Sequence, residues 1–301
     1  MGVLRRPARL RGSAHSDRRW TAFWLLLPAT LGLIVFTFAP IGYALLVSFQ
    51  EFELLAGPAG WVGLQNYRHL FEDPLFLKSV VTTTIYTAMT LVAQVSLGLA
   101  LAILVNQRVR GLAFFRTAYF LPVVASYVVM ASIWKSMYAQ SGIFNTFLIT
   151  AGLGPHPFLT SVREALPSLA ILGVWKFVGF DMLVFLGGLQ AIPREVYQVA
   201  DIDGAGPIQR FFYITLPLLK RVLLFVVVIT TIESFNVFTP VYQMTKGGPQ
   251  ETTHTLVYHV FINGFRYFDM GYATAISFAL VAFVGGLVAI QFRLLRTDVE
   301  Y

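Results

Sequence analysis

The stretch that decides the fold is SVVTTTIYTAMTLVAQVSLGLALAILVN, residues 79–106, which carries no charged side chain. About 20 apolar residues cross the hydrocarbon core of a bilayer as a helix, so this stretch is long enough to span a membrane. Thr21–Phe49, Thr117–Trp134 and Gly271–Phe292 are charge-free and similarly long, and Ala165–Gln190 and Val222–Thr245 are apolar stretches that contain two charges and one charge. The sequence therefore predicts an all-α membrane protein with six transmembrane helices.

The composition of the whole chain agrees with a membrane protein. Of its 301 residues, 56% are hydrophobic and only 12% are charged, whereas soluble domains carry about 25% charged residues. The mean hydropathy is +0.69. The chain has no cysteine, which excludes a disulfide scaffold, an iron–sulfur cluster, cysteine-ligated zinc and a thiol nucleophile.

The distribution of lysine and arginine predicts the orientation of the spans. Fifteen of the 22 basic residues lie in segments 1–20, 107–116, 191–221 and 293–301, whereas six lie in loops 50–78, 135–164 and 246–270. Positively charged loops stay in the cytoplasm, so both termini are expected there. We expect a basic cytoplasmic tail at 1–20, a six-span domain at 21–292 and a cytoplasmic tail at 293–301. The net charge of +7 then reflects topology, and we expect no nucleic-acid partner.

Motifs for enzyme chemistry are missing from the sequence. No GxxxxGK[ST] phosphate loop occurs, so the chain is not expected to hydrolyse ATP itself. GxSxG, HExxH and GxGxxG are also absent. His254 and His259 stand five residues apart, a poor helical spacing for two metal ligands. We expect no metal site and place both histidines at the surface or an interface.

The most informative segment is IPREVYQVADIDGAGPIQRFFYITLPLLKR, residues 192–221. Pro193 and Glu195 suit the start of a helix, and Gly204 suits its end. A second helix is expected from Pro207, leading into the fifth span. Small residues at the bend, Ala200, Gly204 and Ala205, would let another protein's backbone approach closely. Taken alone, the pattern fits an ordinary connector as well as a docking element.

This segment resembles the EAA signature of permeases from binding-protein-dependent ABC importers. In that signature a Glu-Ala-Ala triplet precedes a glycine and then Ile-x-Leu-Pro. The corresponding residues are Gln198-Val199-Ala200, Gly204 and Ile214-Thr215-Leu216-Pro217, so the first two triplet residues depart from the pattern. The MalF-like branch for sugars and glycerol phosphate is matched most closely, through WVGLQNY at 61–67, FRTAYFLP at 115–122, GLQAIP at 188–193 and TKGGPQETT at 245–253.

The resemblance implies the compact six-span form of the type I ABC importer permease fold. In this family two permease subunits form the pathway, two ATPase subunits bind the cytoplasmic loops, and an external binding protein delivers the solute. The second permease is then expected to be a different chain. The role of ATPase coupling falls on Glu195, Gln198, Val199, Ala200, Asp201, Asp203, Gly204 and Ala205 in the loop 192–221.

Charged residues inside spans are costly and are therefore functional candidates. Lys176, Asp181 and Glu233 are such residues. Lys176 and Glu233 could either pair across a helix interface or contact solute, and both possibilities stay open.

Two further polar residues accompany Glu233 on the fifth span. Asn236 shares a helical face with Glu233, whereas Tyr242 would fall on the opposite face unless Pro240 kinks the helix. The residues considered for the substrate pathway are Lys176, Glu233, Asn236 and Tyr242.

The sequence thus predicts a permease subunit in a bacterial or archaeal cytoplasmic membrane, importing a carbohydrate or a glycerol-phosphate-type solute. No cofactor is expected on this chain, and ATP and Mg would be used by the partner ATPases. An ion-driven secondary transporter is one alternative, but it leaves residues 192–221 unexplained. A structural subunit that does not conduct solute is another. An intramembrane enzyme is disfavoured because no catalytic pair or metal-ligand cluster appears.

Overall fold

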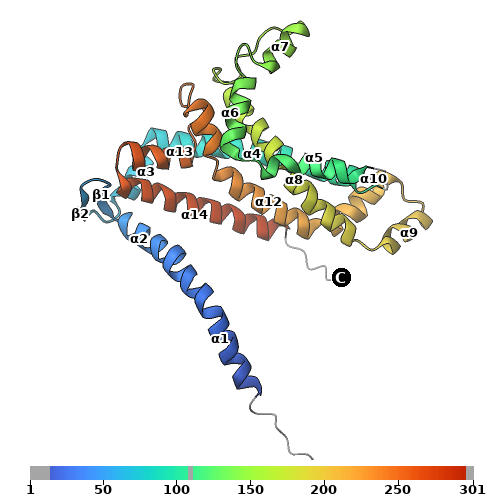
Figure 1. Ribbon diagram of the computed structural model, residues 1–301, viewed down its shortest axis with the longest axis horizontal. Coiled ribbons are helices and arrows are strands. Elements are labelled where there is room, and N and C mark those ends of the chain that lie inside the picture. Colours follow the sequence, from blue (N-terminus) through green and yellow to red (C-terminus); the bar gives the residue numbers. More distant parts are fainter. Residues whose placement is uncertain (1–13, 108–110, 296–301) are drawn as a thin grey trace, which may run out of the picture.

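The computed structural model describes residues 14–107 and 111–295. The predicted tails 1–20 and 293–301 lie largely outside this part of the chain. Four long helices form the body: α4 (Pro74–Val105), α8 (Ala165–Ala191), α12 (Lys220–Phe235) and α14 (Met270–Leu295). An N-terminal run of α1 (Ala14–Leu33), η1 (Ile34–Phe38) and α2 (Ala39–Val47) leans away from this body (Figure 1).

The helices correspond to the six predicted spans if each of two bent helix pairs is taken as one span. Four helical runs are long and apolar enough to cross a membrane: 20–47, 74–105, 165–191 and 270–295. Two bent pairs raise the number to six if each pair is one span. They are α5 (Leu112–Val124) with α6 (Tyr127–Met137), and the run 207–218 with α12.

The predicted span Thr117–Trp134 corresponds to the bent pair of α5 and α6, which meet at an angle of 99°. Ala125 and Ser126 adopt extended backbone conformations between the two helices. Such a break frees carbonyl groups that must find other partners in a membrane. Here the ammonium group of Lys176 on α8 donates hydrogen bonds to three backbone carbonyls at the break.

The predicted span Val222–Thr245 is also interrupted. Helix α12 ends at Phe235, and a separate π-helical turn, η3 (Val241–Thr245), follows Pro240. The interruption lies at residues 236–238, and Pro240 contributes to it because it has no backbone N–H to donate to the carbonyl of Asn236 four residues before it. The apolar length is instead completed at the other end by α10 (Pro207–Arg210), η2 (Phe211–Thr215) and α11 (Leu216–Leu218).

The loops outside the spans carry short elements, including a departure from the all-α prediction. Strands β1 (Gln50–Glu53) and β2 (Gly57–Trp61) form an antiparallel hairpin. Further helices are α3 (Gln65–Glu72), α7 (Ile143–Thr150), α13 (Leu256–Phe261) and η4 (Ile262–Arg266). Gly271 lets the start of α14 pack tightly against β1, since a Cβ at Gly271 would lie 2.3 Å from the carbonyl oxygen of Gln50.

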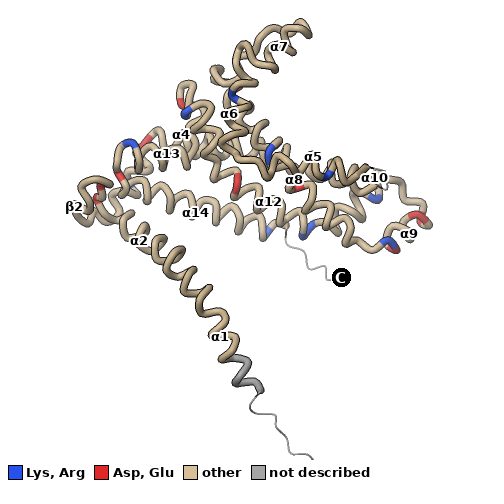
Figure 2. The backbone as a smooth tube through the Cα atoms, in the orientation of Figure 1, with Lys and Arg blue, Asp and Glu red and all other residues tan. Residues whose placement is uncertain are grey.

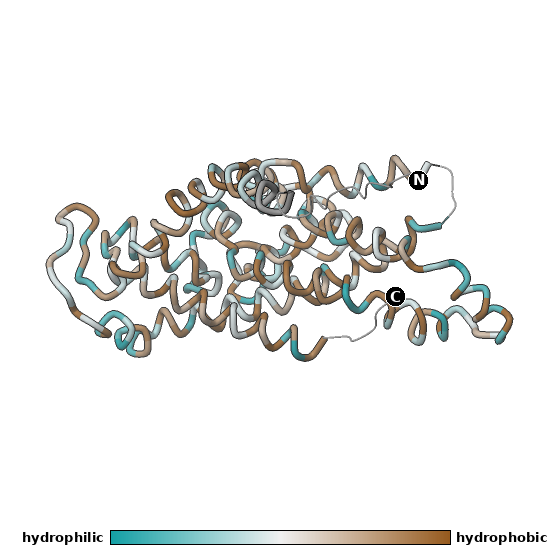
Figure 3. Tube along the Cα trace, turned by 90° about the horizontal axis from the view of Figure 1, so that it is seen from below, coloured by the Kyte–Doolittle hydropathy of each residue, from teal (hydrophilic) through white to brown (hydrophobic). Residues whose placement is uncertain are grey.

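The two ends of the body differ in composition from its middle. The hairpin lies at one end, and α9 (Arg194–Ile202) with α10 lies at the other (Figure 1). Charged residues gather mainly toward the ends and loops (Figure 2), and hydrophobic residues dominate the helices between them (Figure 3). This arrangement suits a bilayer around the middle of the body.

Candidate functional site

Helix α9 and the turn after it have the geometry that the sequence predicts. Gly204 has a φ of +74°, which a glycine adopts without strain. The backbone N–H of Ala205 donates to Ala200 O at 2.9 Å, and that of Gly204 donates to Asp201 O at 3.2 Å. These two bonds satisfy the last carbonyls of α9 in a Schellman motif. The helix therefore ends at a defined point and turns into α10.

Side chains then fix α9 against α10. Arg210 forms an ion pair with Asp201, and its Nε donates to Ala205 O at 2.8 Å. The side-chain oxygen of Gln209 accepts from the backbone N–H of Gly206 at 2.9 Å, capping α10. We define residues 194–210 as the helical hairpin. Contacts within this segment hold its two helices together.

Most of the predicted coupling residues lie at the surface of the helical hairpin. Those that are exposed or half-buried are Glu195, Gln198, Val199, Asp201, Asp203, Gly204 and Ala205. Ala200 is 6% exposed, so the prediction that it lets another backbone approach is wrong; its side chain packs inside this chain.

Two further surface residues of the helical hairpin were not predicted from the sequence. Ile202 and Ile208 are 85% and 75% exposed. Apolar residues beside a predicted turn were the signal that could have found them. Together with Val199, they give the hairpin an apolar surface that a partner protein can cover.

A pocket of about 280 Å³ lies within the spans. It brings together Glu233 and Asn236, two residues that the sequence singles out, and both are exposed in the isolated chain. Asn236 is the C-cap that follows the last residue of α12, and its side chain donates to Ile232 O at 2.8 Å. We call this cavity the pathway pocket. Its other lining residues are Tyr86, Thr90, Gln94, Tyr127, Gly173, Phe177, Ile232, Ser234, Val237, Phe238 and Thr239.

The α4 side of this pocket was missed by sequence reasoning. Thr83, Thr87, Thr90 and Gln94 are buried and follow one another at intervals of three or four residues, which places them on one helical face. This polar stripe on an apolar helix was a readable signal. Thr90 shares a hydrogen bond of 2.8 Å with Ser234 of α12, which joins the two walls of the pocket.

The other two pathway candidates lie elsewhere. Lys176 is 3% exposed and does not line the pathway pocket. Both Lys176 and Glu233 belong to the described part of the chain, and there no ion pair of 4 Å or less joins their side chains. Tyr242 lies outside the lining as well, but its ring stacks on that of Phe238, which does line the pocket, with centroids 5.3 Å apart.

The two neighbouring histidines are buried, so of the two predicted positions, the surface or an interface, the surface is wrong. His254 and His259 are 6% and 2% exposed and share a hydrogen bond of 3.1 Å. His259 Nε2 lies 3.1 Å from Asp73 Oδ2, which also accepts from the Tyr272 hydroxyl at 2.9 Å. Asp73 is in turn the N-cap of α4, accepting from Leu75 N. The cluster ties the segment around α13 and the start of α14 to the start of α4.

Burial governs the charge state of this cluster. Burial, reinforced by the neighbouring His259, lowers the pKa of His254 to about 4. Burial also lowers the pKa of His259, although the Asp73 carboxylate opposes that change. For Asp73, burial alone would raise the pKa, but hydrogen bonds from Tyr272 and from backbone N–H groups, with the nearby His259, lower it overall. The cluster is therefore neutral histidine beside ionised aspartate at pH 7.

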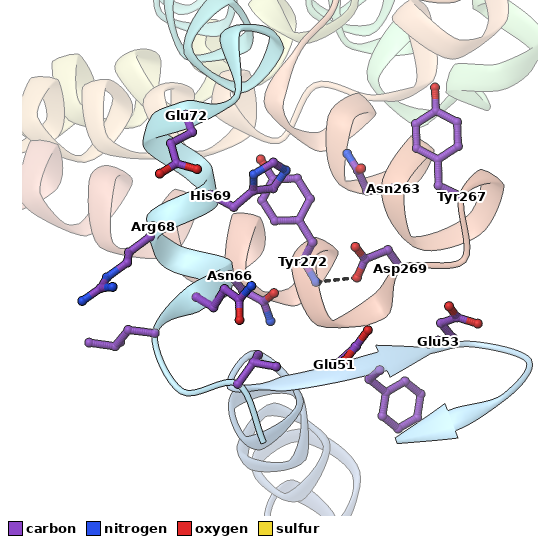
Figure 4. A pocket seen from close by; sticks show the side chains of 14 residues that line it. Glu51, Glu53, Asn66, Arg68, His69, Glu72, Asn263, Tyr267, Asp269 and Tyr272 are labelled. Atoms are coloured by element: carbon purple, nitrogen blue, oxygen red, sulfur yellow. Dashed lines mark hydrogen bonds between the residues drawn. The ribbon is translucent and has the colours of Figure 1, made fainter. Parts of the chain in front are cut away.

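A larger cavity of about 990 Å³ lies outside the spans, between β1, α3 and the start of α14 (Figure 4). Its lining carries the carboxylates of Glu51, Glu53, Glu72 and Asp269, together with Arg68. It is at the opposite end of the molecule from the helical hairpin. Among the described residues, no group of three or more histidine, aspartate or glutamate side chains is placed to hold a metal ion.

A helical membrane body, an interrupted span lining a pocket and a preformed helical hairpin define a transport subunit. Residues 94–296 match the family described as binding-protein-dependent transport system inner membrane component. The chain belongs to this family, and it is an ABC transporter permease of the inner membrane.

Two curated relatives match nearly the full chain. The probable ABC transporter permease protein YesP of Bacillus subtilis (strain 168) is 34% identical, over 91% of this chain and 90% of its own. The sn-glycerol-3-phosphate transport system permease protein UgpA of Pectobacterium atrosepticum is 32% identical, over 94% and 96%.

The fold is shared with a solved structure as well. A chain of a bacterial ABC transporter involved in the import of the acidic polysaccharide alginate superposes with a TM-score of 0.84 at 22% identity. The match covers 95% of this chain and 98% of that one. The same kind of transporter in complex with an alginate pentasaccharide-bound periplasmic protein gives a TM-score of 0.83. The chain thus has the fold of type I ABC importer permeases.

Proposed function

We propose that this chain forms half of the pathway through which an ATP-driven importer moves a carbohydrate or a glycerol-phosphate-type solute. The observation that carries this proposal is the pathway pocket, where Glu233 and Asn236 present polar groups at the interruption of a span. Interrupted helices offer free polar groups at membrane depth, which is how transporters commonly build solute sites. Because both side chains are exposed in the single chain, a second permease subunit can close the pathway opposite them.

The chemistry of the pocket favours an uncharged carbohydrate within this range of solutes. Hydroxyl, amide and aromatic groups line it, through Thr90, Gln94, Tyr127 and Phe177. Such groups exchange hydrogen bonds with sugar hydroxyls and cover apolar sugar faces. Among the described lining residues there is one carboxylate, Glu233, and no lysine or arginine, so a phosphate would face a carboxylate with no cation in the lining itself.

The helical hairpin supports coupling to a separate ATPase. Its exposed apolar residues and its internal ion pair make a rigid element that can follow movement of a partner. Closure of an ATPase dimer around bound ATP and Mg would then shift the spans between two states. This chain itself binds no cofactor in this scheme, and its role is mechanical.

The remaining assignments follow from this scheme. Both termini lie in the cytoplasm of a bacterial cell, with tails at 1–20 and 293–301 flanking a six-span domain at 21–292. The partners are a second, different permease chain, two ATPase subunits, an extracytoplasmic solute-binding protein and the lipid bilayer. Nucleic acid is not a partner.

Isolation of the complex tests the proposal. The tagged chain is purified from mildly solubilised native membranes, its partners are identified by mass, and ATP hydrolysis is assayed on the product. We expect one ATPase and a second permease in the eluate. Recovery of the chain alone, with uptake that depends on an ion gradient, would contradict the proposal.

A further inference from the structure

The 99° break between α5 and α6 leaves backbone carbonyls of α5 without helical partners. Lys176 of α8 supplies them with donors. Its Nζ lies 2.8 Å from Pro122 O, 3.0 Å from Val123 O and 2.8 Å from Ala125 O. An ammonium group has three donors, so its whole capacity is used by this one break. A positive charge is also favourable at the C-terminal end of α5.

This contact explains why a lysine is tolerated inside a span. A buried charge in a membrane needs partners that replace water, and the three carbonyl oxygens do so. Lys176 neither lines the pathway pocket nor forms a direct ion pair with Glu233 in the described structure. Its partners are the backbone groups of the break.

The same ammonium lies beside two walls of the pathway pocket. Its Nζ is 5.6 Å from the ring centroid of Tyr127 and 5.2 Å from that of Phe177. The two rings meet edge to face, with centroids 5.6 Å apart, and both line the pocket. Tyr127 is the first residue of α6, so its position depends directly on the angle of the break.

We propose that Lys176 is a positioning residue: its ammonium holds the α5–α6 break at a fixed angle and thereby keeps Tyr127 and Phe177 at the pathway pocket. The consequence for transport rests on the proposed function, whereas the effect on the break does not. Loss of the three hydrogen bonds leaves Val123 O and Ala125 O without the lysine donor and Pro122 O with only the backbone N–H of Ala125 at 3.3 Å, so α6 should sample several angles relative to α5.

The test combines a distance measurement with uptake. Because the chain has no cysteine, spin labels can be placed at A118C on α5 and I133C on α6 in the purified importer complex. A panel of radiolabelled disaccharides and glycerol 3-phosphate is first screened for uptake by the wild type in proteoliposomes. The solute that is transported best is then used to measure uptake by the variants. For Lys176→Met we expect a broadened distance distribution and a KM raised about tenfold, equivalent to about 1.4 kcal/mol.

Lys135→Met is the matched control. Lys135 also donates to a backbone carbonyl, Gln243 O at 3.2 Å, but from an exposed position on α6. We expect this variant to leave both the distance distribution and the KM unchanged. If Lys176→Met does not accumulate, Lys176→Arg replaces it, because a planar guanidinium cannot direct three donors to the same carbonyls; it too should broaden the distribution.

The outcomes separate the two proposals. An unchanged distance distribution in the Lys176 variants would overturn the positioning role. A broadened distribution with an unchanged KM would also overturn it, provided that Glu233→Gln or Asn236→Ala raises the KM. If those two pocket variants also leave the KM unchanged, the proposed pathway is contradicted, whereas the role of Lys176 in fixing the α5–α6 angle is still supported by the broadened distribution.

Discussion

Gly98 of α4 lies against Asp181 of α8, so that a Cβ at Gly98 would stand 2.8 Å from the Cβ of Asp181. The absence of a side chain at Gly98 allows the two spans to approach this closely. Asp181 is 1% exposed; Thr230 donates to its Oδ2 at 3.4 Å, and among the described residues no donor lies within 3.5 Å of its Oδ1 in hydrogen-bonding geometry. Close helix packing around small residues is a main source of stability between spans.

Gly98→Ala should therefore destabilise the protein. Overpacking of a dense interface costs about 1–3 kcal/mol, and here the new methyl group would press on the Cβ and the backbone of Asp181. We expect a lower Tm for the purified complex in detergent. Gly187→Ala is the control, because a Cβ there meets nothing within 4 Å. Equal Tm values for Gly98→Ala and the wild type would show that the interface can relax.

Gly204→Asp should uncouple transport. The substitution places a side chain and a negative charge at a position with a φ of +74°, on the surface of the helical hairpin. Coupling between two sites is typically worth 1–3 kcal/mol, so we expect uptake to fall by about 5- to 150-fold, with membrane insertion intact. Gly206→Ala, at a φ of −71°, should transport almost normally. Normal uptake by Gly204→Asp would count against the coupling role.

Arg210→Ala should loosen the helical hairpin. It removes both the ion pair with Asp201 and the bond from Nε to Ala205 O. Hydrogen bonds from charged groups are worth about 1.5–3 kcal/mol, whereas a partly exposed ion pair alone contributes about 1 kcal/mol or less. Cleavage by a protease near residues 203–206 should therefore rise strongly in Arg210→Ala and only slightly in Asp201→Asn. Similar cleavage of the two variants would assign the stability to the ion pair instead.

The buried histidines should make the protein sensitive to acid. The pKa of His254 is about 4 in the folded chain, against an ordinary value of 6.5. At pH values between these two pKa values the unfolded chain therefore binds more protons than the folded chain. The free energy of unfolding accordingly falls as the pH is lowered from about 6.5 to 4. Tm values of the purified complex across this range should show the loss. His254→Asn, which cannot be protonated there, should flatten the dependence; a slope equal to that of the wild type would contradict the assignment.

Local sequence signals predicted the spans and the helical hairpin well. Charge-free stretches such as 79–106 are long enough to cross a membrane on their own, and they became α4 and its companions. Gly204 ended α9 as expected, because only a few residue types adopt its backbone conformation readily. Glu233 and Asn236 share a pocket because they are three residues apart on one helix.

Features that depend on distant contacts could not be predicted. The break after Val124 is stabilised by Lys176, more than 50 residues away in the sequence. His259 and Tyr272 reach Asp73 across 186 and 199 residues, so their burial has no local signature. Local sequence left open whether Lys176 pairs with Glu233 or contacts solute for the same reason, since the backbone carbonyls that Lys176 binds belong to another part of the chain.

The most direct test of the central claim is uptake by the complete importer reconstituted in proteoliposomes, comparing the wild type with Glu233→Gln and Asn236→Ala. Both variants keep the helical hairpin intact, so basal ATP hydrolysis should be unchanged. If this chain forms half of the pathway, the KM or the maximal rate of uptake should change in at least one of them, by about tenfold for the loss of roughly 1.4 kcal/mol. Unchanged affinity and rate in both variants would contradict the account.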